Sequence, residues 1–437
     1  MLSNKINDLI NSKPEVFGKS MSFAPMFESG LSILDYRNGF YNTELDVERI
    51  GLMGGKITSF IGPSSSGKTT YAIQAAATIA RNFTNSNIIH YDFEDATTDE
   101  RIYQITGFNK EEFKNKYTKL NTDISLESVD KLIRGIRDVK KQNPDDFMYE
   151  TDKIGEDGKP IRYMVPTIVI IDSVATMASA EIDDKDGEGG QMDATKQAKH
   201  NTAFIKRIVG SSTLNSANIM LFLVNHITTK IDINPYQKTA KPLNYLKEGE
   251  ALPGGVAINY MANNMFKITA GSALDGEGNS NQAKYGVKGY ISNIDIIKSR
   301  SNSSGVSFKA VMIQKSGFSN ELTNLLYLQE NKMLKGSPRA YFIEGMEDVK
   351  FTLKTFLSKI EENKEFAKYF DKYMRTIYKE KFLEEISYEG QLEEKMVGGD
   401  EEEFKLIECV NEEDDIWLGS DGKYYDSGKN EIEVVEE

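Results

Sequence analysis

The sequence contains very little cysteine, tryptophan and histidine. Of its 437 residues one is cysteine, Cys409, one is tryptophan and three are histidine. A single cysteine excludes an internal disulfide bond and suits a reducing compartment, so we expect a cytoplasmic protein. No run approaches the roughly 20 apolar residues that a membrane-spanning helix needs, and the first ten residues are too polar for a signal peptide. We therefore expect no membrane partner.

The chain also lacks an excess of positive charge. Its formal net charge is −14, which at first argues against a nucleic-acid partner. However, residues 393–437 hold 17 acidic side chains and four lysines, whereas residues 1–392 hold 50 acidic and 49 basic side chains. The body of the chain is therefore nearly neutral and can carry local basic patches. The acidic tail either solubilises the protein or competes with a nucleic acid for a basic groove on the same chain.

A phosphate-binding pattern lies between a predicted strand and a predicted helix. Residues 57–61 predict a buried strand and residues 69–80 a helix, and the pattern G-x-x-x-x-G-K-T lies between them. The glycines let backbone N–H groups turn toward phosphate oxygens, the lysine reaches the β- and γ-phosphates, and the threonine hydroxyl can bind Mg²⁺. We prefer this interpretation to an ordinary loop because both flanking elements are predicted. The expected nucleotide-binding residues are Gly62, Pro63, Ser64, Ser65, Ser66, Gly67, Lys68, Thr69 and Thr70.

Three further predicted strands end in residues that suit phosphoryl chemistry. Residues 87–93 precede Glu94, which is placed to orient or deprotonate an attacking water; a helix-capping acid is the alternative. Residues 167–171 form an apolar run that ends at Asp172, which is placed to hold Mg²⁺ together with Thr69. Residues 218–224 end at Asn225-His226, where His226 offers a donor for a γ-phosphate, although a polar strand end needs no such role.

Two segments after Asp172 suit single-stranded DNA. A glycine-rich acidic stretch, residues 178–191, precedes a helix predicted over residues 193–209, and residues 227–255 predict a long loop with lysines and tyrosines. Lysines bind phosphates and tyrosines stack on bases. For the first segment, the residues alone favour an ordinary solvated helix face over a DNA contact. The candidate DNA-binding residues are Gln191, Lys196, Lys199, Lys206, Arg207, Lys230, Tyr236, Lys238, Lys241, Gly254 and Gly255.

These motifs, in this order, resemble the core of the RecA family over residues 25–330. The resemblance rests on Ser-Gly-Leu-x-x-Leu-Asp at residues 29–35, the phosphate loop, Asp-Phe-Glu at 92–94, the strand that ends at Asp172, Asn-His, and Lys-Ser-Arg at 298–300. The Asn-His and Lys-Ser-Arg motifs have the form found in bacteriophage recombinases of the UvsX kind. The resemblance implies an α/β, RecA-like P-loop ATPase core with a mostly parallel central sheet flanked by helices, which uses ATP and Mg²⁺.

The resemblance also implies roles for single residues. Glu94 would be the catalytic base, His226 the γ-phosphate sensor, and Lys298 and Arg300 a charge clamp on the ATP of a neighbouring subunit. Lys199 and Lys206 match positions that carry DNA-contacting arginines in the family. Independently of the family, Tyr103 is a candidate for packing on the adenine, with ordinary packing as the alternative.

The implied activity is that of a DNA-dependent ATPase that drives homologous recombination and repair. Such a protein forms a helical homo-oligomeric filament on single-stranded DNA, pairs it with duplex DNA and exchanges strands. A mediator or loader protein and a single-strand-binding protein are the implied partners, in the host cytoplasm if the genome is viral. Two alternatives remain open: a RecA-fold hexameric helicase, and a nucleotide-switched regulatory ATPase that does not bind DNA.

We divide the chain into four parts. Residues 1–24 are an N-terminal helix, over residues 1–13, and a linker, and this helix either docks on a neighbouring subunit or frays. Residues 25–335 are the ATPase core, which includes a helix over 125–142 capped by Ser125, a surface insertion at 143–166 and paired strands over 284–315. Residues 336–392 are a small C-terminal helical region, with helix predicted over 347–386. Residues 393–437 are the acidic tail, with a local hairpin near Trp417.

Overall fold

The computed structural model describes most of the chain in two compact units. One unit contains residues 1–41 and 48–384, and the other contains residues 42–47 and 385–437. The predicted N-terminal helix and most of the segments 178–191 and 227–255 lie outside the described residues. Those described are 25–42, 47–122, 125–154, 158–177, 191–229, 245–247, 249–253, 257–274, 285–386, 406–411, 416–419 and 424–425.

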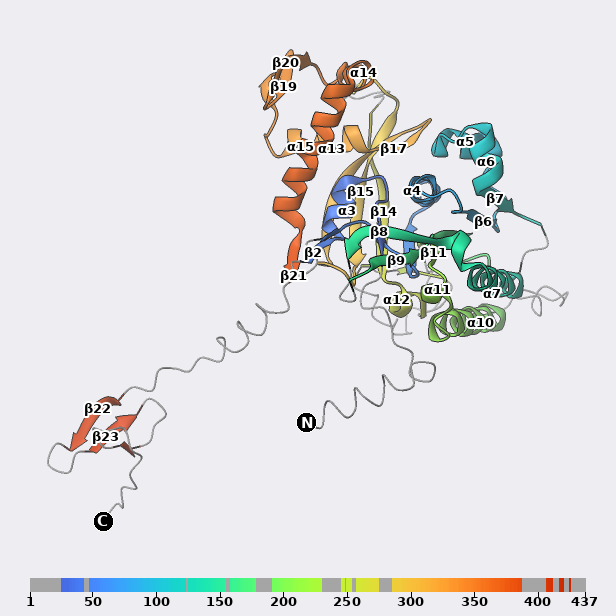
Figure 1. Cartoon of the computed structure of the whole chain (residues 1–437), viewed down its shortest axis with the longest axis horizontal. Helices are drawn as coiled ribbons and strands as arrows, with labels where there is room; N and C mark the ends of the chain where they lie inside the picture. Colours follow the sequence, from blue (N-terminus) through green and yellow to red (C-terminus); the bar gives the residue numbers. More distant parts are fainter. Residues whose placement is uncertain are drawn as a thin grey trace. The chain divides into compact units, whose positions relative to one another are not determined.

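A nine-stranded, mostly parallel sheet runs through the first unit (Figure 1). Its first six strands are parallel to their neighbours, and the last three add an antiparallel meander at one edge. The sheet and its helices confirm the predicted mixed α/β class. The strands, in sheet order, are β7 (Tyr117–Leu120), β6 (Ile88–Asp92), β10 (Thr167–Asp172), β11 (Ile219–His226), β5 (Ile57–Gly62), β14 (Asn264–Ala273), β15 (Gly289–Lys298), β16 (Val306–Ile313) and β17 (Gly317–Ser319).

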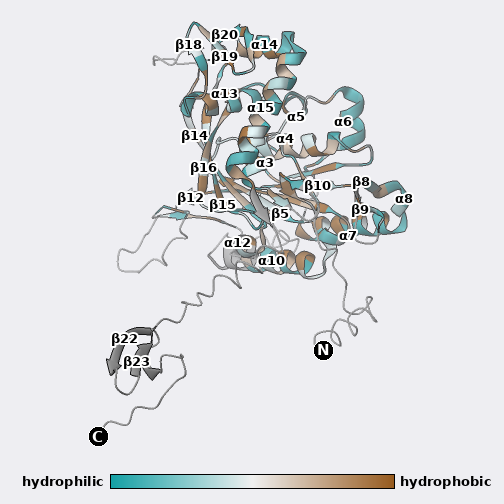
Figure 2. Ribbon diagram, turned by 60° about the vertical axis from the view of Figure 1, so that its left-hand side comes forward, coloured by the Kyte–Doolittle hydropathy of each residue, from teal (hydrophilic) through white to brown (hydrophobic). Residues whose placement is uncertain are grey.

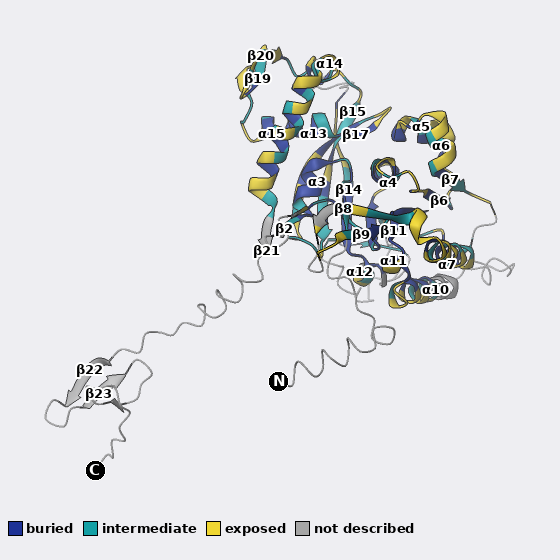
Figure 3. Cartoon of the chain, viewed as in Figure 1, coloured by how far each residue is buried: buried dark blue, intermediate teal, exposed yellow. Residues whose placement is uncertain are grey.

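Helices cover both faces of this sheet, so that the central strands are buried on both sides (Figures 1 and 3). In β10, for example, Ile168 and Ile170 belong to one hydrophobic cluster and Val169 and Ile171 to the other. Strands buried in this way read as continuous apolar runs, and Figure 2 shows the hydrophobic colouring on them. One cluster includes α3 (Ser32–Arg37), α4 (Lys68–Arg81), α5 (Asp99–Thr106), α13 (Asn320–Glu330) and α15 (Lys364–Phe382); the other includes α7 (Leu126–Gln142), α10 (Gln191–Gly210), α11 (Thr213–Ser216) and α12 (Ala257–Met261).

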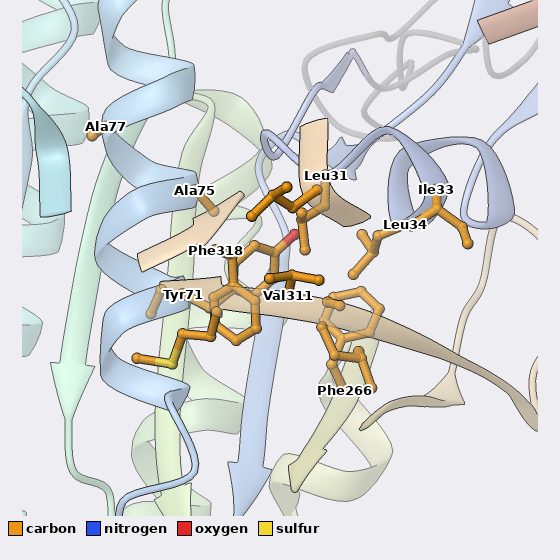
Figure 4. Close-up of a cluster of buried hydrophobic side chains, with 14 of the residues drawn as sticks. Leu31, Ile33, Leu34, Tyr71, Ala75, Ala77, Phe266, Val311 and Phe318 are labelled. Carbon is orange, nitrogen blue, oxygen red and sulfur yellow. The ribbon is translucent and has the colours of Figure 1, made fainter. Parts of the chain in front are cut away.

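The helix after the phosphate loop is anchored by an aromatic residue. Tyr71 of α4 is fully buried, and its ring lies against Phe318 and Phe60 at centroid distances of 5.2 and 5.7 Å. Figure 4 shows it in the same cluster as Val311, while small side chains such as Ala75 let the helix approach the sheet closely. This packing fixes the position of α4, which directly follows the loop between β5 and this helix.

The buried carboxyl group of Asp35 is linked to Tyr71 through the Ser29 hydroxyl. Asp35 of α3 accepts hydrogen bonds from the Ser29 amide (2.9 Å) and the Ser29 hydroxyl (2.6 Å), and the Tyr71 hydroxyl lies 2.7 Å from the same Ser29 oxygen. Burial raises the pKa of Asp35 to about 8, although the Ser29 hydrogen bonds act in the opposite direction. A carboxylate without a charge partner is costly in such a place.

We expect stability to depend on pH through this group. Because the folded-state pKa of Asp35 is raised, its stabilising contribution is fully present below the pKa of the unfolded chain and is lost as pH rises through about 8. Asp35→Asn keeps the oxygen that accepts from Ser29 and removes the ionisation. Thermal unfolding at pH 5 and pH 9 should show that the variant loses less stability than the wild type over this interval. Equal losses would show that Asp35 does not titrate there.

Most predicted core elements are confirmed. Ser125 caps α7 through a hydrogen bond from the Ser128 amide, and β15 pairs antiparallel with β16 where paired strands were predicted. The insertion over 143–166 contains a short helix and a hairpin of two antiparallel strands. The neighbouring helix α7 is tied to its end, because the Lys140 amine donates to the Val165 carbonyl at 2.7 Å. The insertion's elements are α8 (Pro144–Phe147), β8 (Met148–Ile154) and β9 (Pro160–Met164).

The helical prediction over residues 347–386 is wrong at both ends, because residues 347–351 and residues 384–386 form strands. β20 (Met346–Phe351) closes a three-stranded antiparallel sheet with β18 (Lys335–Ser337) and β19 (Ala340–Ile343). Gly345 makes the turn at a φ of 83°, and a Cβ there would lie 2.0 Å from the Tyr369 hydroxyl. The helices begin only afterwards, as α14 (Phe356–Glu362) and α15, and buried side chains of α15 share the cluster of α3.

The remaining described elements are short. In the second unit, β22 pairs with β23 and β23 with β24, all antiparallel. Within the described part of the chain, no helix combines the length and apolar character needed to cross a membrane. The short elements not yet given are β1 (Met26–Phe27), β2 (Phe40–Asn42), β3 (Val47–Arg49), β4 (Leu52–Met53), α6 (Lys110–Lys116), β12 (Thr228–Thr229), β13 (Glu250–Ala251), β21 (Glu384–Ile386), β22 (Leu406–Asn411), β23 (Ile416–Gly419) and β24 (Tyr424–Tyr425).

Candidate functional site

Four parallel strands bring the predicted site residues to one edge of the central sheet. β5 ends at Gly62, β6 at Asp92, β10 at Asp172 and β11 at His226. In the sheet register Asp172 pairs with Asp92, and His226 pairs with Gly62. Glu94 follows β6 by two residues. Residues from four separate stretches of sequence therefore meet at the carboxyl edge, where open α/β sheets bind ligands.

The loop between β5 and α4 has the backbone of an anion cradle. Gly62 and Gly67 have φ values of 153° and 94°, and a Cβ on Gly62 would lie 2.1 Å from the Ile268 carbonyl oxygen. No side chain caps the first turn of α4, so its N–H groups stay available to a ligand. The Ser66 hydroxyl is buried and has no hydrogen-bond partner among the described residues. The loop therefore fits a phosphate chain.

The Lys68 amine lies within this loop. Its Nζ donates to the Pro63 carbonyl oxygen at 2.6 Å, and the side chain is buried. Burial lowers the pKa of Lys68 to about 8, while the nearby carboxylates of Asp172 and Glu94 act in the opposite direction. A phosphate in the loop would favour the charged amine, because an opposite charge close by raises a lysine pKa.

Thr69 and Asp172 form a pair suited to a divalent cation. The Thr69 hydroxyl donates to Asp172 Oδ2 at 2.5 Å, and Asp172 is buried at the end of β10. Burial raises the pKa of Asp172 to about 6, and its Oδ1 is buried without a hydrogen-bond partner among the described residues. A hydroxyl and a carboxylate with a spare oxygen fit Mg²⁺, which takes oxygen ligands and keeps several waters.

Glu94 and His226 lie beside this pair. Glu94 Oε1 accepts a hydrogen bond from the Ser173 hydroxyl at 2.5 Å and lies 3.1 Å from His226 Nε2. Burial, with a further contribution from Lys68, holds the pKa of His226 below its usual value, so the neutral imidazole donates to Glu94 at neutral pH. Ligand atoms of Glu94, Asp172 and His226 lie within 4.8 Å of one another, which also suits a cation.

Lys298 and Arg300 lie at the opposite edge of the sheet from the phosphate loop. β15 begins near the loop, where the Tyr290 hydroxyl donates to the Ser65 carbonyl oxygen at 3.4 Å, and it runs antiparallel to β14 toward Lys298. The Lys298 amine and the Arg300 guanidinium both donate to the Tyr260 carbonyl oxygen, at 2.9 and 2.7 Å.

The register of the strands shows how far the cation pair is from the loop. Lys298 pairs with Met265 of β14, which pairs with Ser59 of β5. Ser59 precedes Gly62 by three residues, about 10 Å of strand, and Arg300 continues in the opposite direction. The pair is thus aimed away from the phosphate loop of its own chain.

The predicted adenine contact of Tyr103 remains a prediction. The ring of Tyr103 stacks on Phe113 at 4.2 Å between centroids, and Phe113 stacks on Tyr117 at 5.4 Å. Arg101, on the same helix, donates to the carbonyl oxygens of Gln314 and Lys315, both at 2.8 Å. Ordinary packing therefore accounts for one face of the Tyr103 ring.

Only part of the predicted DNA-binding set lies among the described side chains. Lys199 and Lys206 are exposed on α10, and Arg207 forms an ion pair with Asp130 of α7 at 3.1 Å. β12 starts two residues after His226 and pairs with β13, so the described ends of the second predicted DNA segment lie near the carboxyl edge of the sheet. The side chains of Gln191 and Lys196, and the residues Lys230, Tyr236, Lys238, Lys241, Gly254 and Gly255, lie outside the described part.

Sequence reasoning missed two contacts of the site. Ser173 donates to Glu94, and Tyr290 donates to the phosphate loop. The position of Ser173, directly after Asp172, was an available signal, because a polar residue after a strand-end acid faces the same edge. Nothing in the sequence places Tyr290, since it lies on a strand that reaches the loop only through the sheet order.

A scan of protein-family models finds no family that matches this chain, and a search of curated proteins finds no significant relative.

Proposed function

We propose that this protein is an ATP-dependent DNA recombinase of the RecA type, which forms a helical filament on single-stranded DNA and promotes homologous pairing and strand exchange. The nucleotide would lie at the carboxyl edge of the sheet, with its phosphates in the loop from Gly62 to Thr70. Lys68 would hold the β- and γ-phosphates, and Thr69 and Asp172 would hold Mg²⁺. A cation held there would neutralise phosphate charge and help to orient the γ-phosphoryl group for attack.

One observation supports this proposal: the Gly62–Thr70 loop and the cation pair of Lys298 and Arg300 lie at opposite edges of one sheet. The loop, Glu94 and His226 are at the carboxyl edge, and Lys298 and Arg300 are at the other. Cations that lie far from the phosphate loop of their own chain can contact a nucleotide bound in the loop of another copy. Such head-to-tail contacts, when repeated, generate a helix or a ring. Cations at developing phosphate charge contribute strongly to catalysis.

The same geometry supports a link between the nucleotide and DNA. The described ends of the second predicted DNA segment follow His226 through β12 and β13, and Tyr260, whose carbonyl oxygen accepts from both cations, lies in the helix after that segment. Loss of the γ-phosphate would remove a contact of His226 and would release the neighbour's cations. Either change can loosen the grip on DNA and the subunit interface together.

The test is imaging and ATPase measurement on the purified full chain. We expect helical filaments in negative stain with single-stranded DNA, Mg²⁺ and a non-hydrolysable ATP analogue, and ATP hydrolysis that single-stranded DNA stimulates. Closed rings with directional unwinding would favour the helicase alternative. A chain that stays monomeric with nucleotide, Mg²⁺ and DNA together would refute the proposal.

A further inference from the structure

The hydroxyl of Ser173 makes a short hydrogen bond within the candidate site. Ser173 is fully buried, directly follows Asp172, and donates to Glu94 Oε1 at 2.5 Å. The hydroxyl of Thr176 donates in turn to the Ser173 carbonyl oxygen at 3.0 Å and holds the turn after β10. The buried Ser173 hydroxyl, which lies just after β10, therefore donates to Glu94, which lies just after β6.

The Glu94 side chain is not held in place by burial. It lies in an exposed turn after β6, and a glutamate in that position has several rotatable bonds. Both hydrogen bonds that the described residues make to its carboxylate, from Ser173 and His226, use the same oxygen, Oε1. Oε2 has no hydrogen bond within the described part of the chain, so it is the oxygen left to face a water.

We propose that Ser173 is a positioning residue for Glu94: its hydroxyl fixes the carboxylate through Oε1 so that Oε2 faces the attacking water. This inference rests on the proposed ATPase function. In the step, an O–H bond of the water breaks and its proton passes to Glu94 Oε2 while the water oxygen bonds to the γ-phosphorus. The bond between that phosphorus and the β,γ-bridging oxygen breaks, and ADP leaves with the electron pair.

The geometry separates this role from nucleotide binding. The Ser173 hydroxyl is engaged with Glu94 and Thr176, whereas the phosphate loop and the Thr69–Asp172 pair are held by their own contacts. Removing the hydroxyl should therefore disorder the base and leave the cradle in place. Loss of a hydrogen bond to a charged group corresponds to roughly a 10- to 100-fold change.

The experiment compares Ser173→Ala with the wild-type full chain. We expect kcat for DNA-stimulated ATP hydrolysis to fall about 10-fold or more, with the KM and the affinity for a fluorescent ATP analogue changed by less than about 2-fold. Ser86→Ala is the matched control, because Ser86 is also fully buried and donates at 2.7 Å, to Pro166, at the amino end of β6. It should leave kcat unchanged.

A double-mutant cycle distinguishes positioning of Glu94 from a purely structural role of Ser173, because only positioning makes the effect of Ser173→Ala on kcat depend on Glu94. In a Glu94→Gln background, Ser173→Ala should reduce the residual rate by less than about 2-fold, because the two residues act as one unit. An unchanged or raised kcat in Ser173→Ala, additive losses in the cycle, or a parallel loss of ATP affinity would overturn the inference. If the wild type hydrolyses no ATP, the proposed function fails instead.

Discussion

Lys68→Ala should abolish ATP hydrolysis, with a loss of about 100-fold or more in kcat/KM. Lys68 is the cation inside the loop of residues 62–70, where its amine donates to the Pro63 carbonyl oxygen. Alanine leaves the backbone cradle but removes the charge that, under the proposed function, would hold the γ-phosphoryl group. The rate of phosphate release and the affinity for a fluorescent ATP analogue measure the loss. Lys110→Ala, an exposed lysine of α6, is the control and should behave as wild type.

Mixing experiments make this prediction specific for a site shared between two copies. A Lys68→Ala chain still offers Lys298 and Arg300 to a neighbour, and an Arg300→Ala chain still offers an intact phosphate loop. With random assembly, about one interface in four combines the two intact halves, so the inactive variants should regain activity when mixed. If the mixture stays as inactive as its parts, the cations do not act on a neighbouring chain.

The central layers were predictable because each buried strand carries its own signal. Residues 168–171 of β10 and 219–224 of β11 are uninterrupted apolar runs, as expected for strands covered on both faces. The C-terminal region was harder. In residues 346–351 the apolar positions suit a strand or a helix face almost equally well, and the hairpin depends on a left-handed turn at Gly345. Local pattern could not decide between them.

Within the candidate site, strand ends were predictable and lateral contacts were not. Glu94, Asp172 and His226 lie at one edge as expected, because Asp172 and His226 end parallel strands and Glu94 follows the end of β6 by two residues. Contacts such as Ser173 to Glu94 depend on side-chain direction and on which strands are neighbours in the sheet. The pairing of Arg207 with Asp130 likewise depends on how α10 packs against α7.

Glu94→Gln should separate ATP binding from ATP hydrolysis. Glutamine has nearly the same shape and keeps an oxygen that can accept from Ser173 and His226, but it cannot take a proton from water. We expect hydrolysis to fall by about 100-fold or more while ATP and DNA still bind, since a positioned base contributes about 10²–10⁴ in rate.

The consequence for assembly follows from the same reasoning. If hydrolysis releases DNA, a chain that binds ATP but cannot cleave it should stay on single-stranded DNA, so dissociation after dilution should slow markedly in a fluorescence assay. Glu100→Gln, an exposed acid in the first turn of α5, is the control and should dissociate at the wild-type rate. Normal ATP turnover by Glu94→Gln would show that another group is the base. A loss of turnover without slower dissociation would show that hydrolysis and DNA release are not coupled.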